Sequence, residues 1–225
     1  YLIFNGINID NLGNYEYIGI VSLGKFQIPF LILALGLLIN ATNYIDGVDG
    51  LLLTFFICCL GYYIFLIEEP KTINLIKLLL IPVILNLILN MLPSKSQFKF
   101  FSGNIGSLFI GFFISFITIE LYNEFNIHPA YLIWPLWYPV YDFLFVSLNR
   151  AIIKKSIFSA DNSHLHHKVL IKFKKDHLKT ILLYFTSNVS IIYFGFLISN
   201  FSKLLSLTAF VLGFLFYLTV RFKLK

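Results

Sequence analysis

The sequence has few charged residues and almost no cysteine. Only 12% of its 225 residues are charged, against about 25% in an ordinary soluble domain. Hydrophobic residues make up 58%, and the mean hydropathy is +0.83. The two cysteines, Cys58 and Cys59, are adjacent in an apolar run, which disfavours a disulfide between them and gives no zinc-binding spacing. The composition indicates an integral membrane protein. Because no signal peptide is visible and the first residue is Tyr1, we expect the chain to lack its true N-terminus.

Long apolar runs predict an all-α, polytopic membrane fold that forms a single transmembrane domain over residues 1–225. A membrane-spanning helix needs about 17–25 apolar residues. Seven segments meet this requirement: 28–45, 50–67, 73–92, 105–122, 130–149, 180–199 and 204–220. Pro82, Pro135 and Pro139 fall inside predicted spans, where proline is tolerated if neighbouring groups satisfy the freed carbonyls.

Lysine and arginine are distributed unevenly between the predicted connections. The connection 150–179 is strongly basic, and threading the spans from it puts three more segments on the same side: 46–50, 93–104 and 221–225. This side holds most of the 17 Lys and Arg residues, so the positive-inside rule makes it cytoplasmic. Within 150–179 we expect a short amphipathic helix capped by Ser163, and on the opposite side a polar extended loop over 5–27.

Polar residues recur every third position in the first candidate segment, which lies between two apolar runs. These residues are Asn40, Asn43, Asp46 and Asp49. On a helix this spacing forms a row that drifts slowly around one side, and the two Asp-Gly pairs predict that the helix breaks into a turn. Ionisable groups at a membrane edge are costly and are functional candidates by default. The segment can hold a hard cation or face a polar substrate; the alternative is a simple loop of turn-forming residues.

A glycine-rich segment, Gly103-Asn104-Ile105-Gly106-Ser107, opens the predicted span that starts near Ile105. Glycine permits close approach of the backbone, and a helix N-terminus presents free N–H groups and a positive dipole to anions. The alternative interpretation is tight packing between membrane helices.

Three histidines, His164, His166 and His167, follow Asp161 in the basic connection. Imidazoles beside lysines can donate hydrogen bonds to phosphate or sugar oxygens. A solvated basic loop, or a helix lying on anionic lipid, explains the lysines well but the clustered histidines poorly. A zinc site would need a second ligand pair, which the segment lacks.

Asp142 stands near the middle of the predicted span 130–149. An unpaired carboxylate there is improbable. One interpretation is a structural ion pair with a neighbouring helix, for instance through Arg150. The other is a transport pathway lined by Asp142 with Pro135 and Pro139, which would make the protein a transporter.

Taken together, the motifs between Asn40 and His167 form one ordered pattern. It reads N-x-x-N-x-x-D-G-x-D-G-L, then G-N-x-G-S, then P-x-x-D, followed by R and S-x-F-S-x-D-x-x-H-x-H-H. This pattern resembles the polyprenyl-phosphate N-acetylhexosamine-1-phosphate transferases (glycosyltransferase family 4). It looks most like the bacterial undecaprenyl-phosphate N-acetylglucosamine-1-phosphate transferase branch.

The resemblance implies a magnesium-dependent enzyme of the bacterial inner membrane, with its active site facing the cytoplasm. It would transfer N-acetylglucosamine 1-phosphate from a UDP-sugar to undecaprenyl phosphate and release UMP, as the first membrane step of a surface-glycan pathway. Manganese could replace magnesium. The implied partners are the UDP-sugar, the polyprenyl phosphate and the membrane, with room for a homodimer and no role for nucleic acid.

Residue by residue, the resemblance assigns catalysis to Asp46, Asp49 and His166, and metal binding to Asp46 and Asn104. The substrate-binding residues that it implies are Asn40, Asn43, Gly103, Gly106, Ser107, Arg150, Asp161, His164 and His167.

Two features depart from the family pattern. An aspartate pair on an earlier cytoplasmic loop has no match here, and the family's G-D-x-G-S has an amide, Asn104, in place of the aspartate. An amide oxygen can ligate magnesium but adds no charge, so metal affinity should fall. The chain is then either an enzyme in which another acid compensates, or a weakened or non-catalytic relative that binds nucleotide sugar or lipid phosphate.

Overall fold

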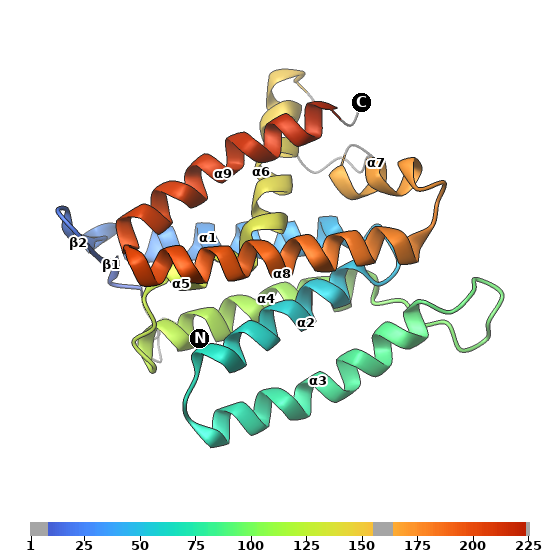
Figure 1. The fold of residues 1–225 in the computed structure, drawn as a ribbon, viewed down its shortest axis with the longest axis horizontal. Coiled ribbons are helices and arrows are strands. Elements are labelled where there is room, and N and C mark those ends of the chain that lie inside the picture. Colours follow the sequence, from blue (N-terminus) through green and yellow to red (C-terminus); the bar gives the residue numbers. More distant parts are fainter. Residues whose placement is uncertain (1–8, 155–163, 224–225) are drawn as a thin grey trace.

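The computed structural model describes residues 9–154 and 164–223, and the predicted all-α class is confirmed apart from one small hairpin (Figure 1). The hairpin lies in the segment predicted as a polar extended loop, and its two strands are antiparallel. The elements in chain order are β1 (Asn11–Tyr15), β2 (Gly19–Ser22), η2 (Gly24–Phe26), α1 (Gln27–Ile45), α2 (Leu51–Leu66), α3 (Pro70–Asn90), α4 (Gly103–Asn123), α5 (Pro129–Leu132), η3 (Trp134–Leu136), α6 (Trp137–Ile152), α7 (Leu165–Lys172), α8 (His177–Phe201) and α9 (Lys203–Lys223).

Five helical segments of the described chain are long and apolar enough to cross a membrane, fewer than the seven that were predicted. They are Gly24–Ile45, Pro70–Asn90, Gly103–Asn123, His177–Phe201 and Lys203–Lys223. The predicted span 50–67 is helix α2, which has 16 residues and is apolar but shorter than a typical span.

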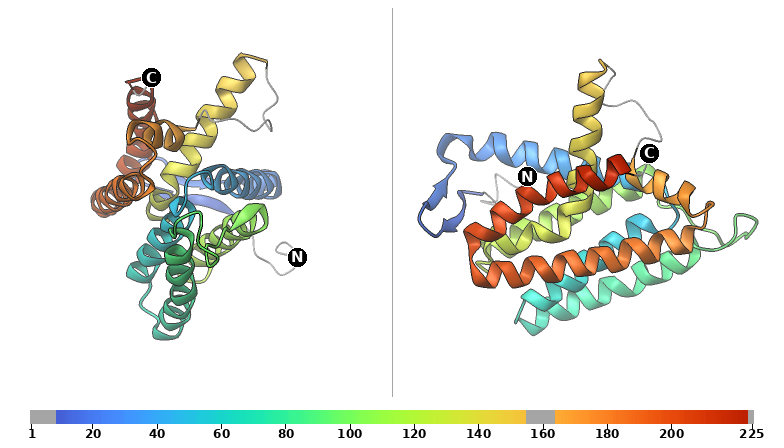
Figure 2. Two further views of the ribbon diagram at one scale, coloured as in Figure 1. Left: turned by 90° about the vertical axis from the view of Figure 1, so that its right-hand side faces the viewer. Right: turned by 45° about the horizontal axis from the view of Figure 1, so that its top comes forward.

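The predicted continuous span 130–149 is wrong, because this stretch forms three successive helices, α5, η3 and α6. Prolines explain the breaks: Pro129 and Pro135 stand in the first turns of α5 and η3, and Pro139 in the first turn of α6. Proline lacks the N–H that would continue a preceding helix but fits the start of a new one. Figure 2 shows α6 crossing the bundle at a steep angle, with its C-terminal end projecting beyond the other helices.

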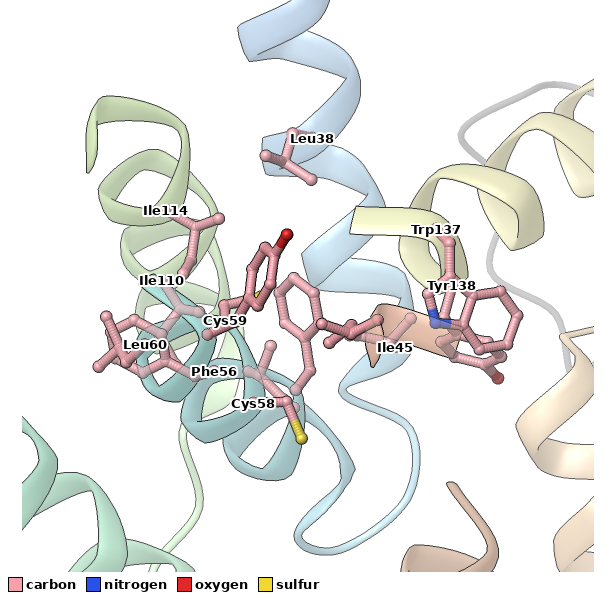
Figure 3. Close-up of a cluster of buried hydrophobic side chains, with 14 of the residues drawn as sticks. Leu38, Ile45, Phe56, Cys58, Cys59, Leu60, Ile110, Ile114, Trp137 and Tyr138 are labelled. Carbon is pink, nitrogen blue, oxygen red and sulfur yellow. The ribbon is translucent and has the colours of Figure 1, made fainter. Parts of the chain in front are cut away.

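Helix α2 forms the centre of the core, which Figure 3 shows in part. Phe55, Cys59, Leu60 and Tyr63 are completely buried along it. A helix that is apolar on all sides needs protein or lipid around its whole circumference, and α2 is enclosed by protein. Cys58 and Cys59 are buried free thiols, in agreement with the expectation that they form no disulfide with each other.

Helices α1 and α4 pack antiparallel at very short range. A Cβ added to Gly111 of α4 would lie 2.8 Å from the Cα of Ile39 on α1, so only glycine fits this contact. The Thr42 hydroxyl donates a hydrogen bond to the Ser107 carbonyl at 3.2 Å, one turn further along the same contact. Close backbone approach of this kind stabilises helix pairs in membranes.

The hairpin closes the end of the bundle opposite to α7 (Figure 1). The Glu16 carboxylate accepts hydrogen bonds from the backbone N–H groups of Lys203 and Leu204, both at 2.8 Å, and so caps α9. Figure 1 places the C-terminal end of α3 and helix α7 together at the other end, which the sequence had predicted to be one shared face.

Candidate active site

The turn between α1 and α2 carries the two predicted carboxylates. Asp46 follows the last residue of α1, and Gly50 precedes α2 with φ +79°, in the left-handed region that glycine adopts at little cost. The Gly50 N–H donates to Oδ1 of Asn90, whose Nδ2 in turn donates to the Phe100 carbonyl at 2.8 Å. Asn90, at the C-terminal end of α3, therefore fixes the position of Gly50, the last residue of the acidic turn.

Asp49 is already held by two residues. Its Oδ2 lies 2.6 Å from Nζ of Lys99, which also donates to the Leu92 carbonyl at 3.0 Å, and its backbone N–H donates to Nδ1 of His177 at 3.2 Å. In the sequence, Lys99 lies in the segment 93–104 that was assigned to the cytoplasmic side, and His177 belongs to none of the predicted site motifs. No short-range pattern connects either residue with Asp49, because they lie 50 and 128 positions further along the chain.

The glycine-rich segment contacts the acidic segment directly. Ser107 Oγ donates to Asn43 Oδ1 at 2.6 Å, as an extension of the α1–α4 contact. One turn further along, the antiparallel register carries Asn104 of α4 toward Asp46, the residue that follows α1, since both lie three residues beyond that hydrogen-bonded pair. Gly103 begins α4 with φ +59°, and a Cβ there would meet nothing within 4 Å, so a ligand can approach this backbone.

The three histidines form one cluster against the acidic turn. The ring centroids of His166 and His167 are 4.4 Å apart, and those of His164 and His166 are 5.4 Å apart and nearly parallel. A Cβ added to Gly47 would lie 2.6 Å from Nε2 of His167 and 3.0 Å from Nε2 of His166. The acidic turn, the glycine-rich segment and the imidazoles therefore meet at one end of the bundle.

Asp142 is completely buried and lies at the base of the histidine cluster. Its carboxylate accepts hydrogen bonds from Nδ1 of His164 at 2.5 Å and from the Leu165 N–H at 3.0 Å. Two residues of α9 complete its surroundings: the Tyr217 hydroxyl at 2.6 Å and Nη1 of Arg221 at 3.2 Å. The structural interpretation of Asp142 is thus correct, but its cationic partner is Arg221 and not Arg150. A carboxylate so occupied is a poor lining for a transport pathway.

Arg150 is buried beside the cluster, with its guanidinium carbon 5.5 Å from the ring centroid of Tyr44 on α1. The Tyr44 ring lies 5.2 Å from that of His164, so Arg150 is one aromatic ring away from the imidazoles. Asn40 is directed elsewhere, because its Nδ2 donates to the Gly36 carbonyl within α1 at 2.7 Å. Asp161 and Ser163 lie outside the described residues, and α7 begins at Leu165.

Burial alters two titratable groups of the site. Burial and the nearby charge of Asp49 raise the pKa of Asp46 to about 6. Burial lowers the pKa of His166 to about 3, so this imidazole is neutral near pH 7. Nδ1 of His166 lies 3.2 Å from the Tyr138 hydroxyl. The buried Nε2 of His166 adjoins Gly47 and has no hydrogen-bond partner among the described residues.

The donor set suits a hard divalent cation better than zinc. The described residues contain no group of three or more His, Cys, Asp or Glu side chains placed to hold a metal ion. Asp46 and Asn104 offer a carboxylate and an amide oxygen, and burial together with the charge of Asp49 raises the pKa of the carboxyl. Magnesium is commonly held by one or two carboxylates together with water and phosphate oxygens, so these residues fit it.

The chain is similar to one protein family and to several curated proteins. The family model for glycosyl transferase family 4 matches residues 1–122, and the chain belongs to this family. The probable undecaprenyl-phosphate N-acetylglucosaminyl 1-phosphate transferase of Bacillus subtilis is 29% identical over 163 residues, which cover 72% of this chain and 45% of that protein.

Two undecaprenyl-phosphate alpha-N-acetylglucosaminyl 1-phosphate transferases are also similar. That of Yersinia pestis is 28% identical over 66% of this chain and 42% of its own length. That of Escherichia coli (strain K12) is 28% identical over 75% of this chain and 47% of its own length. The chain thus spans about half the length of the curated relatives it matches. No solved structure matches it significantly.

Proposed function

We propose that this chain forms part of a membrane transferase that moves a sugar 1-phosphate, N-acetylglucosamine 1-phosphate in the first instance, from a UDP-sugar to a polyprenyl phosphate. An oxygen of the acceptor phosphate bonds to the sugar-bearing phosphorus, the bridging P–O bond to the nucleotide breaks, and UMP leaves. The observation that carries the proposal is that the acidic segment is contacted by the glycine-rich segment at Asn43 and by the histidines at Gly47. The relatives named above, which act on undecaprenyl phosphate by name, support it.

In this proposal Asp46 and Asn104 hold a magnesium ion, which would offset the charge of the phosphates when bound. His164 and His167 bind the nucleotide sugar through hydrogen bonds to its phosphate or sugar oxygens. His166, neutral near pH 7, uses its free Nε2 for the reacting phosphate. Asp49 belongs to the same acidic cluster and keeps the Lys99 ammonium at its edge. Gly103 and Gly106 let the backbone approach the substrate.

An apolar cavity beside the histidines supports a lipid acceptor. The cavity has a volume of about 550 Å³ and is lined mainly by carbon atoms of α6, α7, α8 and α9, including Val169, Leu183 and Phe216. His166 lies in its wall, so a chain held there would end near the imidazoles. A polar site that adjoins an apolar cavity suits a substrate with a charged head and a hydrocarbon tail.

The same end of the bundle carries the basic residues that the sequence assigns to the cytoplasm, including Lys99, Lys172 and Lys175. We therefore place the site at the cytoplasmic surface of the bacterial inner membrane, where a soluble nucleotide sugar and a membrane lipid can both reach it.

The test is direct. The protein expressed from its complete reading frame, purified in detergent and given UDP-N-acetylglucosamine, undecaprenyl phosphate and magnesium, should release UMP and form a diphosphate-linked lipid. Substituting other UDP-sugars tests the donor, and manganese tests the metal. If no UMP forms with any of these donors and metals, the proposed activity is wrong.

Asn104 favours one second candidate, a relative that binds the nucleotide sugar or lipid phosphate without turning it over. The two candidates differ in their response to Asn104→Asp. If turnover increases, the chain is an enzyme with a weakened metal site. If binding of UDP-N-acetylglucosamine persists and no turnover appears, it is a binding protein.

A further inference from the structure

The end of α9 reaches the histidine cluster through one buried carboxylate. Asp142 receives His164 and Leu165 on one side and Tyr217 and Arg221 on the other, in four hydrogen bonds of 2.5–3.2 Å. Oδ1 accepts three of these bonds, from Leu165, Tyr217 and Arg221, and Oδ2 accepts the bond from His164, so both oxygens are hydrogen-bonded. The partners come from two segments 52 or more residues apart in the chain, and Asp142 joins them.

The charges at this point are balanced inside the protein. Asp142 and Arg221 are 0% and 2% exposed, and the Arg221 guanidinium carbon lies 3.9 Å from the ring centroid of Phe145, one turn from Asp142 on α6. A buried carboxylate is tolerated when it is paired and fully hydrogen-bonded, and removing one partner leaves an uncompensated charge. Arg221 and Tyr217 therefore keep Asp142 ionised in the orientation in which it accepts from His164.

That orientation decides where the imidazoles stand. Asp142 accepts from Nδ1 of His164, so Nδ1 carries the proton and Nε2 is directed away from Asp142. Its other oxygen accepts the N–H of Leu165, the first residue of α7. Since the His164 side chain makes no capping hydrogen bond to α7, Asp142 supplies that cap from another helix. The start of α7, which carries His166 and His167, is thus anchored to Asp142.

We propose that Tyr217 and Arg221 of α9, acting through Asp142, are positioning residues that hold the histidine cluster against the acidic turn. Neither Tyr217 nor Arg221 contacts the substrate in the proposed site. The catalytic consequence rests on the proposed transferase function, whereas the positional consequence does not. Loosening the α9 side of Asp142 should free His164 and the start of α7 and move the imidazoles away from Gly47.

Two variants loosen this side without touching the histidines. Tyr217→Phe removes a single hydroxyl, and Arg221→Gln removes the cation, with Arg221→Lys as the conservative rescue. The matched control is Ser206→Ala, at the other end of α9. There the Ser206 hydroxyl is also completely buried, accepts from Trp134 Nε1 at 2.9 Å and donates to the Ala130 carbonyl at 3.1 Å. The control weakens α9 packing and leaves Asp142 intact.

The positional readout is modification of histidine by diethyl pyrocarbonate, followed residue by residue by mass spectrometry on the full protein in detergent. His164 and His166 are 4% and 2% exposed and should react slowly in the wild type. Tyr217→Phe and Arg221→Gln should increase their modification rates at least five-fold, and Arg221→Lys should restore much of the protection. Ser206→Ala should leave these rates unchanged, even though its melting temperature should be no higher than that of Tyr217→Phe.

The catalytic readout is UMP release. Tyr217→Phe should lower kcat about ten-fold with a smaller change in the KM for magnesium, and Ser206→Ala should change kcat less than two-fold. Wild-type rates of modification in both Tyr217→Phe and Arg221→Gln would overturn the proposal. So would equal deprotection by Ser206→Ala. If the wild type releases no UMP, the transferase function fails, while the modification data still decide whether α9 positions the histidines.

Discussion

Gly47 offers the sharpest test of the site, because a single methyl group there would enter the space occupied by the imidazoles. The added Cβ of Gly47→Ala would stand 2.6 Å from Nε2 of His167 and 3.0 Å from Nε2 of His166. An unstrained contact needs about 3.5 Å, so the His167 ring must retreat by about 0.9 Å. Gly47 has no positive φ, so alanine adds no backbone strain.

The expected cost falls on catalysis and not on folding. The atoms that must move are the far ends of side chains, so the free energy of unfolding should change by less than about 1 kcal/mol. A misplacement of about 1 Å at a reacting centre can cost about 100-fold in rate, which corresponds to about 2.7 kcal/mol of transition-state stabilisation. We therefore expect kcat for UMP release to fall about 100-fold at an unchanged melting temperature.

The matched control is Gly36→Ala in α1. A Cβ on Gly36 would meet nothing within 4 Å, and alanine favours the helix more than glycine. This variant should keep wild-type turnover and melt at the same or a higher temperature. If Gly47→Ala also keeps wild-type kcat, the imidazoles are not required at their present distance from the acidic turn, and the reasoning that joins the motifs into one site is refuted.

Further predictions concern the metal, the carboxylates and the hairpin. Asn104→Asp adds a negative ligand and should lower the magnesium concentration for half-maximal turnover about ten-fold; a value equal to the wild type in a magnesium titration would remove Asn104 from the metal site. Because the pKa of Asp46 is raised to about 6, turnover at low magnesium should increase with pH through about 6 as the carboxylate ionises. Saturating magnesium should shift that midpoint downward, and an unshifted pH–rate profile contradicts the assignment. His166→Ala should reduce turnover about 100-fold and leave membrane insertion intact, as judged by UMP assay and membrane fractionation. Hydrogen bonds from the backbone of α9 lower the pKa of Glu16 from 4.5 to about 2, so its stabilisation is complete above pH 4.5 and disappears as the pH falls toward 2. Melting curves of Glu16→Gln and the wild type should therefore differ at pH 7 and converge at low pH.

Much of the site follows from local pattern. The three-residue spacing from Asn40 to Asp49 predicted a row of polar groups that ends in a turn, and the structure has that turn after α1. Sidedness predicted that this turn, Gly103 and the histidines share one face, because charge is expensive inside a membrane. The contacts Ser107–Asn43 and His167–Gly47 agree with that prediction. The chemical roles of these residues stay predictions.

The long-range pairings could not be predicted. Tyr217 and Arg221 reach Asp142 across 75 and 79 positions. In the sequence, Tyr217 lies within the predicted span 204–220 and Arg221 in the basic segment that follows it. A carboxylate in an apolar run indicates that a partner exists but does not identify it, since Arg150 is equally basic and closer in sequence. Tertiary packing alone determines which arginine pairs with Asp142.

The break at 129–139 was misjudged for a different reason. Hydropathy averages over the segment and gives a span, whereas the prolines act at single positions. Pro129, Pro135 and Pro139 each begin a helical segment or stand in its first turn, which is the pattern of new starts and not of one kinked helix. Proline spacing could have signalled α6 from sequence.

The glycine contact between α1 and α4 has a consequence for the proposed site. Because Gly111 brings the backbones of α1 and α4 together near Ile39, the separation of the two helices is set there by main-chain atoms and not by rotatable side chains. A bulkier group cannot be admitted by a change of rotamer; whole helices would have to separate. Any side chain larger than hydrogen at position 111 should therefore act as a wedge between α1 and α4 and disturb the proposed site far from where it is inserted.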